Sequence, residues 1–256
     1  MSMPPSGLRS ALDRQADKQA WVDWLFSRVA ARYDTGNDLL SLGWHTRWKR
    51  RLVEIAAPRR GERTLDLATG TGDVALMVAP LVAPAEVVAT DINGDMLEVA
   101  RRKQPRATTN VRWMVADALD LPFPDGSFDL VTCGYAGRGF PDFPTVVHEI
   151  HRVLAPGGRF VNLDFARPPH RVWDRIYRTW LAVSGAVLGT LLHGHPKTYL
   201  YIPASMSRYP GQRWLDARMR DAGFETRLVE TTACLMAYNI GTKNELPASP
   251  LGKASP

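Results

Sequence analysis

The sequence predicts an α/β fold built on a doubly wound, mostly parallel sheet of seven strands. Short apolar segments alternate with helical segments between residues 64 and about 170, as is typical of parallel strands joined by crossover helices. A Gly-Thr-Gly turn at residues 70–72 joins the first strand to its helix, and Asp91 ends the second strand. Two late strands, which form a hairpin, complete the expected sheet.

The N-terminal part of the chain has a helical pattern. Residues 20–57 form a cap of two expected helices, separated by a turn at Thr35-Gly36-Asn37, where Asn37 can cap the second helix. The expected helices of the sheet region are residues 74–78, 94–104, 142–154 and 212–224, and the expected strands are residues 64–68, 86–90, 111–116, 128–134, 159–165, 225–232 and 234–243.

We expect a single domain over residues 20–243. Residues 170–210 interrupt the alternation as an aromatic and apolar helical insertion, which we expect to cover an apolar acceptor. The alternative is that its apolar stripe packs only against its own domain or against the partner in a homodimer. The tails, residues 1–19 and 244–256, are rich in Pro, Ser, Ala and Gly and are expected to be disordered.

The glycine turn and its neighbouring carboxylates predict a nucleoside pocket. Glycine lets the backbone approach a ligand closely, and the following helix offers free N–H groups. Asp91, at the tip of the second strand, can accept both hydroxyls of a ribose. The third glycine of a dinucleotide motif is missing, and Asp73 stands where a diphosphate would be repelled. With Asp66, these residues favour a cationic nucleoside such as S-adenosylmethionine, and the alternative is a plain strand–helix turn.

Two later strand ends carry further candidate site residues. Asp117 and Ala118 follow the third strand, where Asp117 could accept an adenine amino group or simply cap a turn. Gly134 ends the fourth strand, and Arg138 follows it at the sheet edge where ligands bind in this architecture. Arg138 could fix an anionic substrate oxygen because guanidinium is permanently charged. The alternative is an ion pair with a surface acid.

Composition bounds the cellular setting and the partners. The chain has 256 residues, a net charge of +6 and two cysteines, so one core, no disulfide framework, no metal site and a cytoplasmic location are expected. Basic clusters at residues 47–51 and 101–103 favour anionic surfaces such as nucleic acid or lipid headgroups, or are simply solvated. No RNA-binding module is recognisable. We therefore expect no nucleic-acid partner, and peripheral contact with the inner membrane face stays open.

Longer motifs extend through most of the chain. LFSRVAARYDTGNDLLSLGWHTRWKR begins at residue 25, DLATGTGDVAL at residue 66 and DALDLPFPDGSFD at residue 117, and LAPGGR, TYLYIPAS and a final GTK follow. In these motifs, over about residues 24–243, the chain resembles the ubiquinone/menaquinone biosynthesis C-methyltransferases. The paired patterns YDxxND and SxGxHxxWK near the N-terminus are more specific than the glycine turn.

The resemblance implies a Rossmann-like class I methyltransferase with S-adenosylmethionine as its cofactor and no metal. It also implies that Tyr33 closes over the cofactor and that Arg138 faces the substrate. Arg138 would stabilise an oxyanion, and His45 is a candidate proton acceptor, so Arg138, His45 and Tyr33 are the expected catalytic residues. The expected cofactor-binding residues are Tyr33, Asp66, Ala68, Thr69, Gly70, Thr71, Gly72, Asp91, Ile92, Met96, Asp117, Ala118 and Gly134.

Four positions depart from the pattern of the resembled family. They are Gly139, Gly134, Ala204 and Asn239, where the family usually has Asn, Ser, Glu and His. All four are expected near the acceptor side or the closing strand, so the cofactor half is retained while the acceptor half is altered. This pattern fits a paralogue with a different acceptor as well as a diverged quinone enzyme.

The leading interpretation is methyl transfer to a carbon of a lipophilic, prenylated acceptor of the demethylmenaquinol type. One alternative is a natural-product C-methyltransferase that acts on an isoprenoid or indole-type acceptor. A second is a non-catalytic, cofactor-binding subunit of a quinone-biosynthesis complex. An RNA methyltransferase, suggested only by the basic charge, ranks below these.

Overall fold

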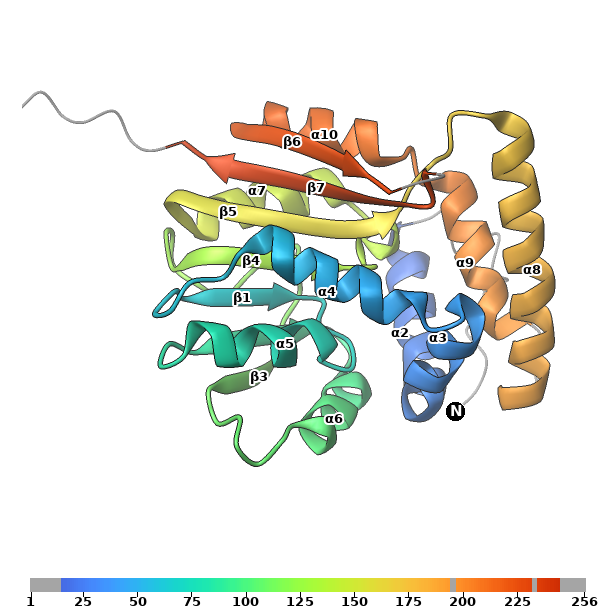
Figure 1. The fold of residues 1–256 in the computed structure, drawn as a ribbon, viewed down its shortest axis with the longest axis horizontal. Coiled ribbons are helices and arrows are strands. Elements are labelled where there is room, and N and C mark those ends of the chain that lie inside the picture. The colour runs from blue at the N-terminus through green and yellow to red at the C-terminus, as the bar shows by residue number, and fades with distance from the viewer. Residues whose placement is uncertain (1–14, 194–196, 232–233, 245–256) are drawn as a thin grey trace, which may run out of the picture.

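The computed structural model describes residues 15–193, 197–231 and 234–244. Its strands are β1 (Thr64–Leu67), β2 (Val87–Asp91), β3 (Val111–Val115), β4 (Phe128–Gly134), β5 (Leu154–Phe165), β6 (Phe224–Glu230) and β7 (Met236–Lys243). They form one seven-stranded sheet of order β3-β2-β1-β4-β5-β7-β6 (Figure 1). The pairs from β3 to β5 are parallel, and β7 is antiparallel to both β5 and β6. The predicted sheet and its late hairpin are confirmed.

Helices cover both faces of the sheet and the carboxyl ends of its parallel strands (Figure 1). The helices are α2 (Gln15–Val29), η1 (Ala30–Arg32), α3 (Tyr33–Ser41), α4 (Trp44–Ala56), α5 (Asp73–Val82), α6 (Gly94–Lys103), η2 (Gly137–Gly139), α7 (Phe143–Val153), α8 (Arg171–His193), α9 (Lys197–Arg208) and α10 (Gln212–Asp221). Within the described ranges, no helix has both the length and the apolar character that a membrane span requires.

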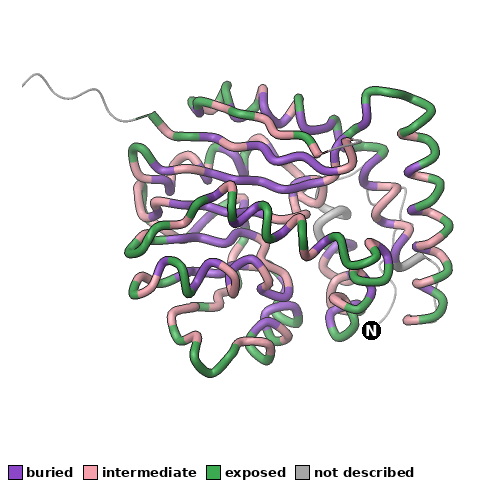
Figure 2. The backbone as a smooth tube through the Cα atoms, viewed as in Figure 1, coloured by how far each residue is buried: buried purple, intermediate pink, exposed green. Residues whose placement is uncertain are grey.

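The core consists of two apolar layers, one on each face of the sheet. On one face, α4 and α5 contribute fully buried side chains such as Leu52 and Val78. On the other face, α7 and α10 contribute Ile150 and Leu215, which are also fully buried. The purple segments in Figure 2 follow the strands between these layers. Burial of this apolar surface provides the main driving force for folding, and it fixes the strand ends where the site lies.

Local sequence signals set the starts of two helices at this edge. Asn93 caps α6 by accepting a hydrogen bond from the N–H of Met96. Asp142 caps α7 in the same way, accepting from the N–H of Thr145. Both are residue types that satisfy the free N–H groups of a first helical turn. The helices therefore begin directly after the strand-end loops that carry the candidate site residues.

The N-terminal cap differs from the prediction in two places. Thr35-Gly36-Asn37 lies inside α3 and forms no turn, so Asn37 caps no helix. The break comes later, at Leu42 and Gly43, which both have positive φ angles of 52° and 77°. The packing of α3 overrides the local turn propensity, since a Cβ on Gly36 would lie only 1.6 Å from the Tyr199 hydroxyl. Gly36 is therefore a close-packing position.

Some other boundaries also differ, since β5 begins at Leu154 where residue 159 was expected, and α5 extends to Val82 where residue 78 was expected. Helix α2 begins at Gln15, so residues 15–19, expected to be disordered, are helical. The rest of the two tails, 1–14 and 245–256, lies outside the described residues. The insertion forms α8 and α9, which stand with α2 and α3 beyond the carboxyl ends of β1, β4 and β5 (Figure 1).

Gly72 provides a test of how tightly the glycine turn is packed. A Cβ at this position would lie 2.5 Å from the Trp113 ring, whereas a Cβ on Gly61 would have nothing within 4 Å, and both residues have positive φ. We expect Gly61→Ala to cost about 1 kcal/mol of unfolding free energy, from backbone strain alone. Gly72→Ala should cost about 1–3 kcal/mol more, from overpacking. Urea unfolding of both variants measures the difference, and equal losses would contradict the packing role.

Candidate functional site

The site begins where the strand order reverses, between β1 and β4. Ligands bind at such a switch point, outside the carboxyl ends of the strands. The loop after β1 leaves the sheet sharply, since Ala68 and Gly70 have positive φ angles of 50° and 56°. A Cβ on Gly70 would have no atom within 4 Å, so this glycine borders open space. The N–H of Gly70 donates to the Asp91 carboxylate over 2.8 Å, which joins the ends of β1 and β2.

Two buried carboxylates lie beneath and beside this turn. Asp66 accepts hydrogen bonds from the hydroxyls of Thr69 and Thr132, so protein groups occupy both of its oxygens. Asp91 accepts from the N–H groups of Gly70 and Asn93. Burial raises the pKa of each carboxyl to about 6 against these hydrogen bonds. Both are therefore mostly ionised at neutral pH and present negative charge to the turn.

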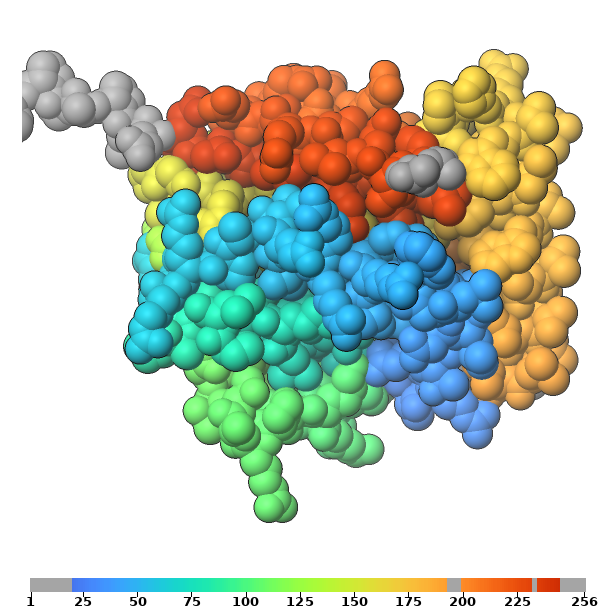
Figure 3. Space-filling view, in the orientation of Figure 1, coloured from blue at the N-terminus to red at the C-terminus, as the bar shows by residue number. Residues whose placement is uncertain are grey.

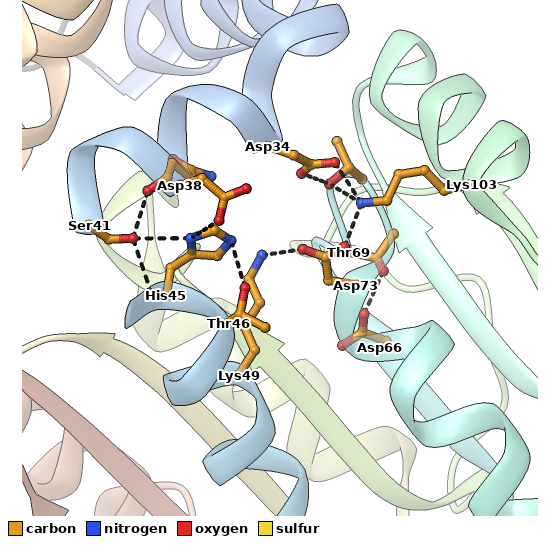
Figure 4. A network of polar contacts seen from close by, with 12 residues as sticks. Asp34, Asp38, Ser41, His45, Thr46, Lys49, Asp66, Thr69, Asp73 and Lys103 are labelled. Atoms are coloured by element: carbon orange, nitrogen blue, oxygen red, sulfur yellow. Dashed lines mark hydrogen bonds and ion pairs between the residues drawn. The ribbon is translucent and has the colours of Figure 1, made fainter. Parts of the chain in front are cut away.

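Asp73 is the centre of a charge network across the turn (Figure 4). Its carboxylate pairs with Lys49 of α4 at 2.6 Å and with Lys103 of α6 at 2.5 Å. Lys103 also pairs with Asp34 of α3 at 2.7 Å, and Asp34 accepts a hydrogen bond from the Thr71 hydroxyl. Asp73 also lines the small polar cavity, but two lysines balance its charge there.

The same network changes the interpretation of the basic clusters. Lys49 and Lys103 belong to the clusters at residues 47–51 and 101–103, yet they turn inward and bind carboxylates. Burial alone would raise the pKa of Asp73, but the charges and hydrogen bonds of both lysines lower it to about 2. Asp73 consequently stays ionised throughout the physiological range.

A small polar cavity lies beside the glycine turn. It has a volume of about 30 Å³. Among its lining residues are seven of the predicted cofactor-binding residues, namely Tyr33, Asp66, Ala68, Thr69, Gly70, Thr71 and Gly134. The structure thus brings the glycine turn, the end of β4 and the N-terminal cap to one place.

A second, much larger cavity adjoins the first. It has a volume of about 540 Å³, within the usual range for small-molecule sites. Its walls are mostly aromatic and aliphatic side chains from α2, α3, α4, α8 and α9. Tyr33 and Tyr135 line both cavities, and Tyr135 has a positive φ of 65°. The two cavities therefore meet at these tyrosines, of which Tyr135 directly follows β4 and Tyr33 begins α3.

Arg138 is the principal charged group in the wall of the large cavity. Its side chain is only 8% exposed and pairs with Asp164 at 2.7 Å, the same guanidinium nitrogen also donating to the Tyr135 carbonyl. The partner of Arg138 is thus a buried acid at the end of β5. The sequence had left two options for Arg138, a substrate oxygen or an acid on the surface. The Nε of Arg138 and the hydroxyls of Tyr135 and Tyr201 are buried without a protein hydrogen-bond partner.

His45 lines the large cavity from the start of α4. Its Nδ1 lies 3.1 Å from the Ser41 hydroxyl and 3.6 Å from an Asp38 carboxylate oxygen. Burial, and then the positive charge of Lys49, lower the pKa of His45 below 6.5. The imidazole is therefore neutral at neutral pH, the state in which it can accept a proton.

The remaining predicted cofactor residues lie outside both cavity linings, and Asp91 is one of them. Ile92 is partly exposed and Met96 is buried beneath α2. Asp117 is exposed and accepts a hydrogen bond from the N–H of Leu119, while Ala118 is buried in the core. Gly72 packs against Trp113. Contacts of these residues with a cofactor stay a prediction.

The four departures from the resembled family do not gather on the acceptor side. Gly134 lines the small polar cavity. Asn239 lies in β7, where its side chain donates to the Gln212 carbonyl over 2.8 Å, so it is a buried structural residue. Only Gly139 and Ala204 lie near the large cavity, through Tyr201. Three of the four departures thus lie on the acceptor side or the closing strand, as expected, whereas Gly134 does not.

Sequence reasoning missed several residues that the fold places at the site. Asp34, Lys103 and Asp164 carry charges there, and Tyr135 and Tyr201 carry unpartnered hydroxyls. Asp164 had a readable signal, since it nearly ends a strand at the edge where ligands bind. Lys103 had none, because its partners lie far away in the sequence.

Comparisons with known proteins agree with this geometry. The sequence profile of the ubiE/COQ5 methyltransferase family matches residues 14–243. The chain belongs to the ubiE/COQ5 methyltransferase family. The predicted methyltransferase activity and S-adenosylmethionine as methyl donor are thereby confirmed.

Curated relatives match over nearly their whole lengths. The chain is 43% identical to a demethylmenaquinone methyltransferase of Thermus thermophilus, with 86% of this chain and 100% of the relative covered. It is 37% identical to a ubiquinone/menaquinone biosynthesis C-methyltransferase, UbiE, of Rubrivivax gelatinosus, with 97% of this chain and 96% of the relative covered.

Solved structures share the fold. A methyltransferase in complex with the Trm112 activator of Haloferax volcanii aligns with a TM-score of 0.65 at 19% identity, covering 86% of this chain and 98% of that one. A SAM-dependent methyltransferase of Thermotoga maritima aligns with a TM-score of 0.63 at 20% identity, covering 86% and 99%. These confirm a Rossmann-like class I methyltransferase fold.

The Asp73 network predicts an effect on acid stability. A carboxyl whose folded pKa lies below its unfolded value contributes stability above the unfolded pKa, here 3.8, and loses it as pH falls towards about 2. Lys103→Met should raise the pKa of Asp73 and remove part of a contribution of about 2 kcal/mol at neutral pH. Chemical unfolding between pH 2 and pH 7 measures this loss. The exposed neighbour Arg102 supplies the control Arg102→Met, and equal curves for both variants would contradict the role of Lys103.

Proposed function

We propose that this enzyme methylates a ring carbon of a prenyl-bearing, demethylmenaquinol-like acceptor. The observation that supports it most is the pair of adjoining cavities, one small and polar at the glycine turn, the other large and apolar with a buried arginine. Relatives named demethylmenaquinone methyltransferase support the acceptor class. A cavity of about 540 Å³ with mostly apolar walls suits an aromatic ring with the first part of an isoprenoid tail.

The residues of the turn fit S-adenosylmethionine. The open space at Gly70 allows close approach of a ligand to the backbone, and Asp91 presents a carboxylate at the end of β2 for ribose hydroxyls. Bound there, the cofactor supplies a methyl group that is electrophilic because a sulfonium carries it. The small polar cavity beside this turn brings Tyr33 of the cap next to the same backbone.

Arg138 is the residue we assign to the acceptor oxygen. A phenolic ring carbon becomes nucleophilic once the neighbouring hydroxyl has lost its proton, and a fixed guanidinium stabilises the resulting oxyanion. Asp164 holds Arg138 in place, and the buried Nε of Arg138 has no protein hydrogen-bond partner. The hydroxyls of Tyr135 and Tyr201 offer two further unpartnered groups in the walls of the same cavity.

His45 is the proton acceptor that we assign. It is neutral because burial lowers its pKa, and it lines the same cavity as Arg138. Ser41 orients its Nδ1 through the contact of 3.1 Å, which is the way a general base is commonly held in place. Tyr33, shared by the two cavities, would separate the reacting groups from bulk water.

The cellular setting follows from the acceptor. We assign the enzyme to the cytoplasm, with peripheral contact at the inner membrane face, because a prenylated quinol resides in the lipid phase. This assignment rests on the acceptor class and on the apolar cavity wall. We propose no nucleic-acid partner.

The acceptor is tested by mass spectrometry after incubation with methyl-labelled S-adenosylmethionine. We expect one labelled methyl group on the ring of demethylmenaquinol and none on isoprenyl diphosphates or indoles. Arg138→Lys should lower kcat about 10²–10³-fold through loss of its donor geometry. Binding of S-adenosylhomocysteine, measured by calorimetry, should stay within twofold.

The matched control is Arg63→Lys, since Arg63 is a surface residue paired with Asp129 away from both cavities. It should leave kcat unchanged. An enzyme that labels an indole or isoprenyl diphosphate while demethylmenaquinol stays inert would overturn the proposed acceptor. Full activity in Arg138→Lys would remove its assigned role.

The role of His45 predicts a particular pH profile. Its neutral form is the active one, and its pKa is lowered below 6.5, so kcat should rise with pH through that lowered pKa and level off before pH 7. The His45→Gln variant should no longer show this acidic limb, and its kcat should be about 10²-fold lower. His148→Gln, at an exposed position on α7, is the control. Measuring kcat from pH 5 to pH 8 decides the question, and an unchanged limb in His45→Gln would rule out the assignment.

A further inference from the structure

Helix α8 exposes a continuous apolar stripe along its outer side. Seven large apolar side chains recur every one to four residues over its 23 residues, and each is 39–73% exposed. This spacing keeps them on one face of the helix, and α8 forms one edge of the molecule (Figures 1 and 3). The residues of the stripe are Val172, Trp173, Ile176, Trp180, Val183, Val187 and Leu191.

The stripe is separate from the face that α8 uses for packing. Tyr177 and Leu181 point inward and are buried in a cluster with Leu40 of α3 and Tyr199 of α9. The stripe therefore adds nothing to the described core. A soluble monomer seldom exposes a connected apolar surface of this extent unless the surface has a binding function.

The stripe continues onto the cap beside the mouth of the large cavity. Leu42, at the break between α3 and α4, is 79% exposed, and Trp44 is 49% exposed. Leu42, Trp44 and Trp180 also line the large cavity. These three residues thus belong both to the outer apolar surface and to the cavity wall, so the two apolar surfaces are continuous.

Basic side chains border this apolar surface. Arg47 lies over the Trp44 ring at 4.8 Å, and Arg171 and Arg175 are exposed at the start of α8. Of the nearby acids, Asp174 is paired with Arg178 and Asp38 is exposed. The border is therefore predominantly positive. Apolar side chains flanked by arginines match the surface of an anionic bilayer, where the rings and aliphatic groups enter the headgroup region.

We propose that the α8 stripe, with Leu42 and Trp44, docks the enzyme on an anionic lipid bilayer and opens the large cavity directly to the lipid phase. The benefit of such docking rests on the proposed acceptor, while the docking itself rests on the exposed surface. A second copy of this chain is the competing occupant, and it would not need the positive border.

Flotation of the full chain with vesicles tests the proposal. We expect binding to phosphatidylcholine vesicles that contain about one third phosphatidylglycerol, and weaker binding at high salt because exposed charges are screened. Val183→Glu and Ile176→Glu place a charge in the stripe and should each weaken binding about tenfold or more. Leu81→Glu is the matched control, because Leu81 is 49% exposed on α5, away from the stripe, and it should bind as the unmodified chain does.

Two further measurements keep docking separate from turnover and from self-association. On a short-chain, water-soluble quinol without vesicles, both stripe variants should retain the unmodified rate, and on a long-chain acceptor in vesicles they should be slower. Absence of flotation, or flotation unaffected by Val183→Glu, would overturn the proposal. So would a dimer that Val183→Glu converts to monomer with no vesicle binding in either form. Flotation without methylation of any quinol would instead leave docking in place and remove the proposed acceptor.

Discussion

The double ion pair of Asp73 is the interaction on which the site depends. Lys49 and Lys103 come from α4 and α6, on either side of the glycine turn, and meet on one carboxylate at the start of α5. An acid is also favoured there by the positive end of the helix dipole. Through Lys103 and Asp34 the network reaches α3, so the cap, the turn and two sheet helices form one charged unit. The carboxylate of Asp73 therefore holds these parts of the site together.

The ion pairs of Lys103 with Asp73 and Asp34 explain why the two cavities adjoin. Helix α3 begins at Tyr33, immediately before Asp34, and holding Asp34 against the turn places Tyr33 beside Tyr135 at the end of β4. The polar and apolar cavities then share these two side chains as a common wall. A transfer reaction between a polar donor and an apolar acceptor needs this juxtaposition, together with exclusion of water. The contact between the two cavities thus depends on Lys103 as well as on the glycine turn.

The sequence predicted the parts of this arrangement that are local. The five parallel strands, the glycine turn and the position of Arg138 follow from periodicity and from the rule that ligands bind at strand ends. The α3–α4 break at Leu42 was missed, because tight packing at Gly36 outweighs its turn propensity. Lys103 and Asp34 are 69 residues apart, and Arg138 and Asp164 are 26 residues apart and come together through the pairing of β4 with β5. Such partners are set by tertiary packing, which no local pattern encodes.

The two departures at Gly139 and Ala204 both lie next to Tyr201. A Cβ on Gly139 would lie 3.4 Å from the Tyr201 hydroxyl, so a side chain at this position would be in van der Waals contact with it. Ala204 is partly buried and packs against the cluster that contains Tyr201. Both small residues therefore leave Tyr201 its place in the cavity wall, with its hydroxyl unpartnered. The two departures are thus linked to one side chain of α9, although they lie 65 residues apart in the sequence.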